Sequence, residues 1–369
     1  MKSTKPLSLY IHLPFCKSFC TYCDFPRLFY KEDFLLPYLA ALKKEIIDLK
    51  IDHPLKTIYI GGGDPLVLPT PNLEDFLKFL LPYSKDTKEF TIEGNPEDVT
   101  KEKASLLLKY NVNRVSLGGQ TSNDERLKAL NRKHRFSDLK NAVSILKEAG
   151  FHNISIDMIY GYPKQTLDDV KRDIQRFYSL DVPHFSTYSL TINPGTKLYY
   201  EHNKEREDDF LADSLTYISS YLRKRGYEHY EVSSFSKPGY QSEHNLTYWR
   251  DMMYYAAGIG ASGFDSLGHY VNTRSYPLYL KGEGRIYEEK TDKNDEIEYF
   301  FLTTLRAKEG FYLKEFKDRF KEDFLTKYAD EYKKLYKLGL LRKDKDHIHV
   351  TEKGYLLLDR ILLSLFPSR

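Results

Sequence analysis

The sequence predicts an α/β fold: an open, partial (β/α)6 barrel followed by a smaller C-terminal helical and winged-helix-like domain. From residue 7 to about 225, short β-branched and apolar segments alternate strictly with amphipathic segments, which is the pattern of a parallel sheet with right-handed crossovers. Six such units are too few to close an eight-stranded barrel. Near the C-terminus, helices return around a polar turn and a short strand, as in a winged helix.

The elements can be placed along the chain from their apolar periodicity and their turn residues. The expected strands are 7–13, 57–60, 89–93, 114–117, 153–159 and 184–190, and the expected helices are 34–49, 73–81, 101–110, 136–149, 167–180 and 208–224. Beyond residue 226 the chain is rich in Tyr and Gly. In the C-terminal part we expect a strand at 347–350 and a helix at 352–365. We expect a barrel core (1–225), an extension (226–290) and a C-terminal domain (291–369).

Composition narrows the class of protein. The 369 residues include 56 Lys and Arg against 53 Asp and Glu, a net charge of +3, and 41% are hydrophobic, which is typical of a folded globular protein. No apolar run reaches the ~18 residues of a membrane span. The weak net charge disfavours a nucleic-acid binder. The only three cysteines lie within eight residues, which excludes a disulfide scaffold and indicates metal chemistry in a reducing compartment, the cytoplasm.

The three cysteines, Cys16, Cys20 and Cys23, follow the first expected strand. They therefore lie at the C-terminal end of that strand, and in parallel α/β barrels the functional groups gather at the C-terminal ends of the strands. Three thiolates on one loop can hold three irons of a cubane cluster and leave the fourth iron without a protein ligand. Two alternatives stay open: a Cys3His zinc site that uses His12 or another histidine, and three free buried thiols.

The ends of other strands carry glycines and acids. Gly61–Gly63 follows the second strand, where its backbone N–H groups can meet an anion; the alternative is a simple tight turn. Glu93 and Asp157 end the third and fifth strands and can accept hydrogen bonds from an amino group and from ribose hydroxyls. The alternative for these acids is a helix cap or an ion pair with Arg114 or Arg132.

These motifs together resemble a known family. The run Tyr10-Ile-His12-Leu-Pro14-Phe-Cys16-x3-Cys20-x2-Cys23, followed by Gly61-Gly62-Gly63, resembles the radical S-adenosylmethionine (SAM) superfamily. More narrowly, it is similar to the branch that contains oxygen-independent coproporphyrinogen III oxidase and the haem chaperone HemW. The similarity continues through Glu93-Gly-Asn95-Pro96, Gln120 with Arg132, Asp157-Met-Ile-Tyr160-Gly161 and Pro194-Gly195-Thr196, to about residue 276.

The resemblance implies a [4Fe-4S] cluster held by Cys16, Cys20 and Cys23, with SAM on the fourth iron and reductive cleavage to a 5′-deoxyadenosyl radical. The residues that it implies around SAM are Tyr10 and Tyr22 beside the cluster, Gly62, Gly63 and Asp64 at the amino-acid end, Glu93, Gln120, Arg132 and Asp157 along the remainder, and Thr191 through its backbone. Asp64 stands where the family usually has Thr. We expect its charge to weaken SAM binding unless a cation compensates.

Two positions separate the branches of this family. Phe25 stands where the oxidases carry a fourth cysteine. The segment His244-Asn245-Leu-Thr-Tyr248-Trp249 is similar to the HNxxYW signature of the chaperone branch. The resemblance therefore makes His244 the first choice as axial haem ligand, with Tyr248 and Trp249 as faces for the porphyrin. The alternative is a structural histidine in a Tyr-rich core.

The function implied by the resemblance is a haem chaperone that binds haem, a [4Fe-4S] cluster and SAM and transfers haem to an unidentified acceptor protein. Peripheral membrane association during delivery is compatible with that role, and no nucleic-acid partner is expected. The enzyme alternative is radical decarboxylation of coproporphyrinogen III to protoporphyrinogen IX. A third hypothesis is a nucleic-acid-binding winged helix with the cluster as sensor, and the weak basicity counts against it.

Overall fold

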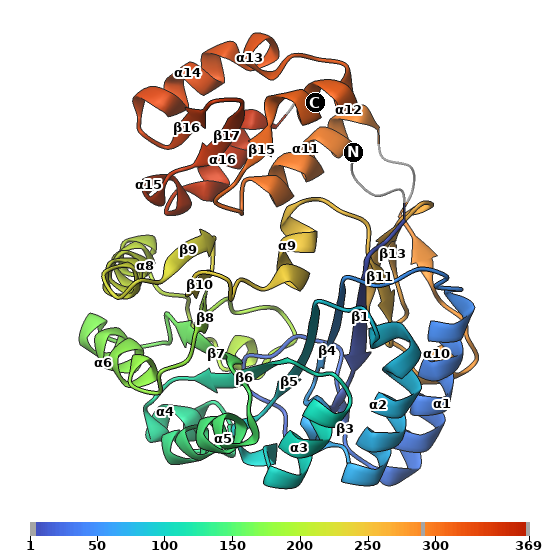
Figure 1. The fold of residues 1–369 in the computed structure, drawn as a ribbon. Coiled ribbons are helices and arrows are strands. Elements are labelled where there is room, and N and C mark those ends of the chain that lie inside the picture. The colour runs from blue at the N-terminus through green and yellow to red at the C-terminus, as the bar shows by residue number, and fades with distance from the viewer. Residues whose placement is uncertain (1–4, 289–291, 367–369) are drawn as a thin grey trace.

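The protein was analysed as a computed structural model that describes residues 5–288 and 292–366 (Figure 1). Six parallel strands form its centre: β1 (Ser8–Leu13), β4 (Thr57–Gly62), β5 (Glu89–Gly94), β6 (Arg114–Gln120), β7 (Asn153–Tyr160) and β8 (His184–Ser189). The helices expected between them are α1 (Glu32–Asp48), α2 (Thr70–Ser84), α3 (Lys101–Lys109), α5 (Phe136–Ala149), α6 (Leu167–Tyr178) and α8 (Asp208–Arg223). The prediction of the partial barrel is confirmed, with every boundary within three residues of its expected place.

The sheet is wider than the six predicted strands. Its order is β11-β1-β4-β5-β6-β7-β8-β10-β9. β11 (Tyr255–Ala257) pairs parallel with β1, whereas β10 (Ser234–Ser236) pairs antiparallel with β8 and with β9 (Glu228–Glu231). These three strands have three or four residues each, too short for a periodic signal in the sequence. They come from the expected extension, which therefore covers both edges of the barrel sheet.

The barrel core is built from the faces that the sequence pattern marks as apolar. Leu9, Ile11 and Leu13 of β1 are fully buried, as continuous apolar strands of a parallel sheet should be. Helix α1 buries Leu35 and Leu42 and exposes Lys44 and Asp48 on its outer side. Among the described residues, no helix has both the length and the apolarity needed to cross a bilayer.

Shorter elements complete the barrel and its extension. They are β2 (Phe15–Cys16), β3 (Leu28–Phe29), α4 (Asp124–Ala129), α7 (Lys197–Tyr200), α9 (Glu243–Trp249), β12 (Ser262–Asp265), β13 (Gly268–Val271), α10 (Tyr276–Leu280) and β14 (Ile286–Tyr287), with single 3-10 turns at Pro65–Val67 and Pro96–Asp98. β12, β13 and β14 form a small antiparallel sheet of their own. Helix α9 contains the HNxxYW segment, for which the sequence showed no helical period.

The C-terminal domain has its own apolar core, dominated by phenylalanines such as Phe300, Phe301 and Phe316. Its elements are α11 (Lys293–Thr304), β15 (Phe311–Tyr312), α12 (Leu313–Phe320), α13 (Phe324–Lys327), α14 (Ala329–Lys337), β16 (Leu341–Asp344), β17 (His347–Val350), α15 (Glu352–Tyr355) and α16 (Leu358–Leu365). β17 confirms the predicted strand. The predicted last helix is divided into α15 and α16, because Leu357 leaves helical geometry at φ −130° and ψ 27°.

The C-terminal domain lies over the end of the sheet at which the parallel strands begin (Figure 1). Glu352 of α15 accepts hydrogen bonds from Ser219 of α8 and His229 of β9 at 2.9 Å each. Arg250, which follows α9, forms an ion pair with Glu309 at 2.6 Å. The cysteine loop leaves β1 at the opposite end. The C-terminal domain and the cysteine loop therefore lie at opposite ends of the strands.

Gly310 provides a test of packing in the C-terminal domain. Its φ is +59°, and a Cβ at this position would lie 1.9 Å from the carbonyl oxygen of Ile348. Gly282 has a φ of +74° but nothing within 4 Å of its would-be Cβ. Both alanine variants carry the cost of positive φ, about 1 kcal/mol, but only Gly310→Ala adds a backbone clash.

We expect Gly310→Ala to lower the free energy of urea unfolding by about 2 kcal/mol more than Gly282→Ala does, because β17 must shift to admit the methyl group. Equal losses of unfolding free energy in the two variants would contradict the close approach of Gly310 to Ile348 of β17.

Candidate metal and cofactor site

A cavity of about 350 Å³ opens at the C-terminal ends of the parallel strands. The loops after several different strands line it, as expected for a parallel barrel. Of the predicted site residues, it brings together Cys16, Cys20, Cys23, Tyr22, Gly62, Gly63, Glu93, Gln120, Arg132, Asp157 and Thr191. Tyr10, Asp64 and His244 do not line it.

The cysteine loop is held by backbone hydrogen bonds to the segment that follows it. Leu28 N donates to Pro14 O at 2.7 Å, and Tyr30 N donates to Cys16 O at 2.9 Å, which closes the loop as the parallel pair β2 and β3. Burial raises the pKa of the Cys16 thiol to about 12 and also raises the pKa of Cys23. Burial therefore disfavours the thiolate form of these two residues, and the positive charge of a bound metal would offset that cost.

The zinc alternative does not fit this geometry. Within the described part of the chain, the sulfur atoms of Cys16, Cys20 and Cys23 do not all lie within 4.8 Å of one another. Two sulfurs bound to one Zn²⁺ at ~2.3 Å can be no more than ~4.6 Å apart. Both ring nitrogens of His12 are also engaged, Nδ1 with Tyr10 Oη at 2.9 Å and Nε2 with Pro26 O at 2.7 Å. A cubane cluster does not require three sulfurs to converge on one metal ion, because its ligands bind different irons.

Two further features fit a cluster with an amino-acid cofactor. A Cβ on Gly63 would lie 2.7 Å from Cys16 Sγ, so only glycine lets this strand end approach the cysteine loop. Arg132 donates to Asn95 Oδ1 at 2.6 Å and lies 3.5 Å from Cys20 Sγ. Its Nε atom is buried and has no partner among the described residues, which leaves one cationic donor for a bound carboxylate.

Glu93 and Asp157 supply the acidic side of the cavity. Glu93 accepts hydrogen bonds from Tyr59 Oη at 2.6 Å and from Gly62 N at 3.1 Å. Burial raises the pKa of Glu93 to about 7, and the nearby Asp157 adds to that rise. Burial also raises the pKa of Asp157, which accepts a hydrogen bond from Ser116 Oγ at 3.2 Å. The oxygen atoms of these two buried carboxyl groups can accept hydrogen bonds from a cationic amino group or from hydroxyls.

Asp64 faces away from the cavity. Its carboxylate accepts hydrogen bonds from Asn95 Nδ2 at 2.9 Å, Asn95 N at 3.2 Å and Leu66 N at 3.1 Å. Burial raises the pKa of Asp64 well above its ordinary value, and a hydrogen bond shared with Asp98 reinforces the shift. Asp98 in turn forms an ion pair with Lys17. The side chain thus caps a 3-10 turn, and its predicted weakening of SAM binding stays a prediction.

His244 lies at the other end of the barrel. Thr57 Oγ1 lies 2.7 Å from its Nδ1, and Tyr248 Oη lies 2.7 Å from its Nε2. The residue is 1% exposed, and burial lowers the pKa of its imidazole to about 3. A haem iron would have to displace Tyr248 or Thr57 to reach either nitrogen. The assignment of His244 as haem ligand stays a prediction, and in this structure the imidazole belongs to a Tyr-rich core.

Helix α9 is fixed by an acid from a distant strand. Glu89, at the start of β5, accepts hydrogen bonds from Glu243 N at 2.8 Å and His244 N at 3.1 Å. The carboxylate therefore satisfies the free N–H groups of the helix N-terminus and complements its dipole. The two partners are 154 residues apart, so no local sequence signal could have indicated this contact.

The cavity also contains residues that the sequence did not single out as ligands. Asn95 links Arg132 to Asp64 by hydrogen bonds at 2.6 and 2.9 Å. It belongs to the recognised Glu93-Gly-Asn95-Pro96 run, so its motif was visible but its role was not. Tyr188, at the end of β8, lines the same cavity and is 42% exposed.

Two family models match the chain. The model described as Radical SAM superfamily matches residues 10–177, and the model described as HemN C-terminal domain matches residues 291–357. The first covers the strands β1 to β7 and the cysteine loop. The second covers most of the C-terminal domain.

Named relatives match almost the whole chain. A protein of Lactococcus lactis named heme chaperone HemW is 39% identical over 96% of this chain and 95% of its own length. Proteins of the same name are 34% identical in Bacillus subtilis, over 95% and 96%, and 33% identical in Escherichia coli, over 98% of both chains. The solved structure of E. coli coproporphyrinogen III oxidase, HemN, superposes with a TM-score of 0.82 at 23% identity, over 98% of this chain and 90% of that one, which shows the shared fold.

Glu93 makes the stability of the metal-free protein depend on pH. Its pKa in the folded chain, about 7, exceeds the ordinary value of 4.5. Between these pH values the unfolded chain releases a proton that the folded chain retains, so stability falls as pH rises and the loss is complete above about pH 7. Glu93→Gln cannot ionise and should escape this loss, which amounts to about 3 kcal/mol.

We therefore expect the difference in unfolding free energy between Glu93→Gln and wild type to grow in favour of the variant from pH 4.5 to pH 8. The exposed Glu283→Gln is the matched control and should show no such trend. A pH-independent difference for Glu93→Gln would show that this carboxyl ionises normally.

Proposed function

Because the chain belongs to the haem chaperone HemW family of the radical SAM superfamily, we propose that it binds haem, holds a [4Fe-4S] cluster with SAM, and passes haem to an acceptor protein. The observation that carries this proposal is the 39% identity, over 96% of the chain, to a protein named heme chaperone HemW. The cysteine cavity supports the cofactor part, because its residues fit a cluster and an amino-acid ligand.

The residues of the cavity have distinct roles in this proposal. Cys16, Cys20 and Cys23 would hold the cluster. Arg132, through its unpartnered Nε, would bind the SAM carboxylate, and Glu93 would accept hydrogen bonds from the SAM amino group. When bound, the cluster and SAM supply one-electron chemistry at the sulfonium. The protein orients the cofactor and excludes water.

The enzyme alternative is oxygen-independent oxidation of coproporphyrinogen III. Its support is the fold shared with HemN, and a fold does not establish an activity. Phe25 stands where the oxidases carry a fourth cysteine, and its ring is 64% exposed at the mouth of the cysteine cavity. We place the protein in the cytoplasm, where its three thiols stay reduced, with the haem acceptor as its partner.

The test combines haem binding with the oxidase assay on one anaerobic, cluster-loaded preparation. We expect stoichiometric haem binding, transfer of that haem to apomyoglobin as a probe acceptor, and no protoporphyrinogen IX from coproporphyrinogen III with SAM and a reductant. The triple variant Cys16→Ser/Cys20→Ser/Cys23→Ser should lose the visible absorption of the cluster. Turnover of coproporphyrinogen III by the wild type would contradict the chaperone proposal.

A further inference from the structure

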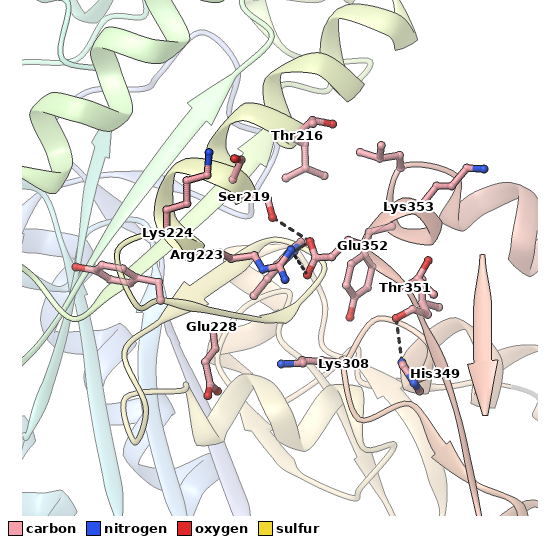
Figure 2. A pocket seen from close by; sticks show the side chains of 17 residues that line it. Thr216, Ser219, Arg223, Lys224, Glu228, Lys308, His349, Thr351, Glu352 and Lys353 are labelled. Atoms are coloured by element: carbon pink, nitrogen blue, oxygen red, sulfur yellow. Dashed lines mark hydrogen bonds and ion pairs between the residues drawn. The ribbon is translucent and has the colours of Figure 1, made fainter. Parts of the chain in front are cut away.

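A cavity that carries no assigned role lies between the barrel and the C-terminal domain. This interdomain cleft has a volume of about 950 Å³, at the upper end of the range for small-molecule sites. Helix α8 and the start of β9 form one wall, and the end of β17 with α15 forms the other (Figure 2). Its apolar surface includes Leu215, Tyr227, Val350 and Leu356. The cleft could therefore accept a large ligand with an apolar body.

Cations surround this apolar surface. Arg223, Lys224, Lys308 and Lys353 all line the cleft, and Figure 2 shows Lys308 below the centre with Lys224 and Lys353 on opposite sides. The Glu352 carboxylate in the middle is compensated by Arg223 at 3.6 Å and by the hydrogen bond from His229 at 2.9 Å. Of the described carboxylates, none forms an ion pair with the three lysines, but Lys353 Nζ donates a hydrogen bond to Leu338 O at 3.0 Å. The Glu228 carboxylate also lines the cleft, so the free cations among the described lining residues are Lys224 and Lys308. The cleft therefore suits a ligand with more than one negative charge.

An unpartnered polar group also lies in the lining. Tyr355 lines the cleft and is only 5% exposed. Its hydroxyl is buried and has no hydrogen-bond partner among the described residues. A buried hydroxyl without a partner costs free energy unless a ligand or water satisfies it.

His349 stands where this cleft meets a second hollow of about 430 Å³, which lies between β17 and α9. Its Nε2 lies 3.0 Å from Asp344 Oδ2. An imidazole that donates one N–H to a carboxylate is the usual arrangement of a histidine metal ligand, because the carboxylate orients the ring and raises its basicity. The other nitrogen, Nδ1, lies 3.3 Å from Val350 O, so an iron bound at Nδ1 would replace this contact, which is longer than the 2.7 Å contacts of both His244 nitrogens. In contrast to His244, this histidine reaches a cavity.

From these observations we propose that the interdomain cleft is the haem site: the porphyrin lies on the apolar wall, Lys224 and Lys308 bind the propionates, and His349 is the axial ligand. The proposal rests on the haem-binding function proposed above, and it moves the site from His244 to the C-terminal domain. Haem combines the three features that the cleft matches: an apolar plane, two carboxylates and an iron that accepts imidazole. The haem would then lie at the opposite end of the strands from the cysteines.

The test titrates ferric haem into the anaerobic, cluster-loaded full chain. His349→Ala should weaken binding at least tenfold and remove the spectroscopic signature of histidine ligation, whereas His152→Ala, an exposed histidine elsewhere, should change neither. The double reversal Lys224→Glu/Lys308→Glu should weaken haem binding at least tenfold but leave binding of haem dimethyl ester nearly unchanged. Lys85→Glu/Lys140→Glu is the matched control for charge.

The outcomes separate this proposal from the proposed function. If wild type binds haem and both the His349 and the lysine variants bind it equally well, the cleft is not the site and the chaperone function stands. Loss of haem ligation in His244→Ala alone would assign the site to α9. If the wild type binds no haem, the proposed function itself fails.

A metal ion is a competing occupant of the same region. Asp344, His347 and His349 have ligand atoms within 4.8 Å of one another. Binding of Zn²⁺ to these residues without any effect on haem binding would also overturn the proposal.

Discussion

The parallel pairing of β1, β4, β5, β6, β7 and β8 is the constraint on which the rest of the structure depends. Parallel strands bring all their C-terminal ends to one rim. That rim gathers the cysteine loop, the Gly62–Gly63 turn, Glu93 and Asp157 from separate units of the chain into one cavity. The same pairing sends the start of every strand to the other end, where α9 and the C-terminal domain pack.

One side chain links the two ends. Tyr59, in the middle of β4, stacks on His244 with ring centroids 5.0 Å apart and donates to Glu93 at 2.6 Å. Glu93 in turn accepts the N–H of Gly62 in the cofactor cavity. The HNxxYW segment is thus connected to the cofactor cavity through the barrel core, although His244 does not line that cavity. The segment can therefore be coupled to the cavity of the cysteines although none of its side chains lines it.

The sequence predicts the barrel core well, because the core depends on local patterns, whereas the roles of the cysteines and their neighbours stay predictions. The six central strands are mostly buried, β1 and β4 read as largely apolar runs, and the three cysteines lie on one loop. Contacts between distant segments carry no such signal. Glu89 fixes α9 from 154 residues away, β11 has three residues, and Asp64 turns toward Asn95. The basic interdomain cleft likewise depends on how the two domains meet.

The central claim is that haem and cluster occupy opposite ends of the barrel. Pulsed EPR between the reduced cluster and the ferric haem measures their separation directly. The two sites lie beyond opposite ends of strands such as β1, which has six residues. At ~3.3 Å per residue such a strand is ~20 Å long, so the cluster and the haem should lie at least that far apart. A dipolar coupling that corresponds to this distance or more would agree with the account. A strong coupling from two irons in the same cavity would contradict it.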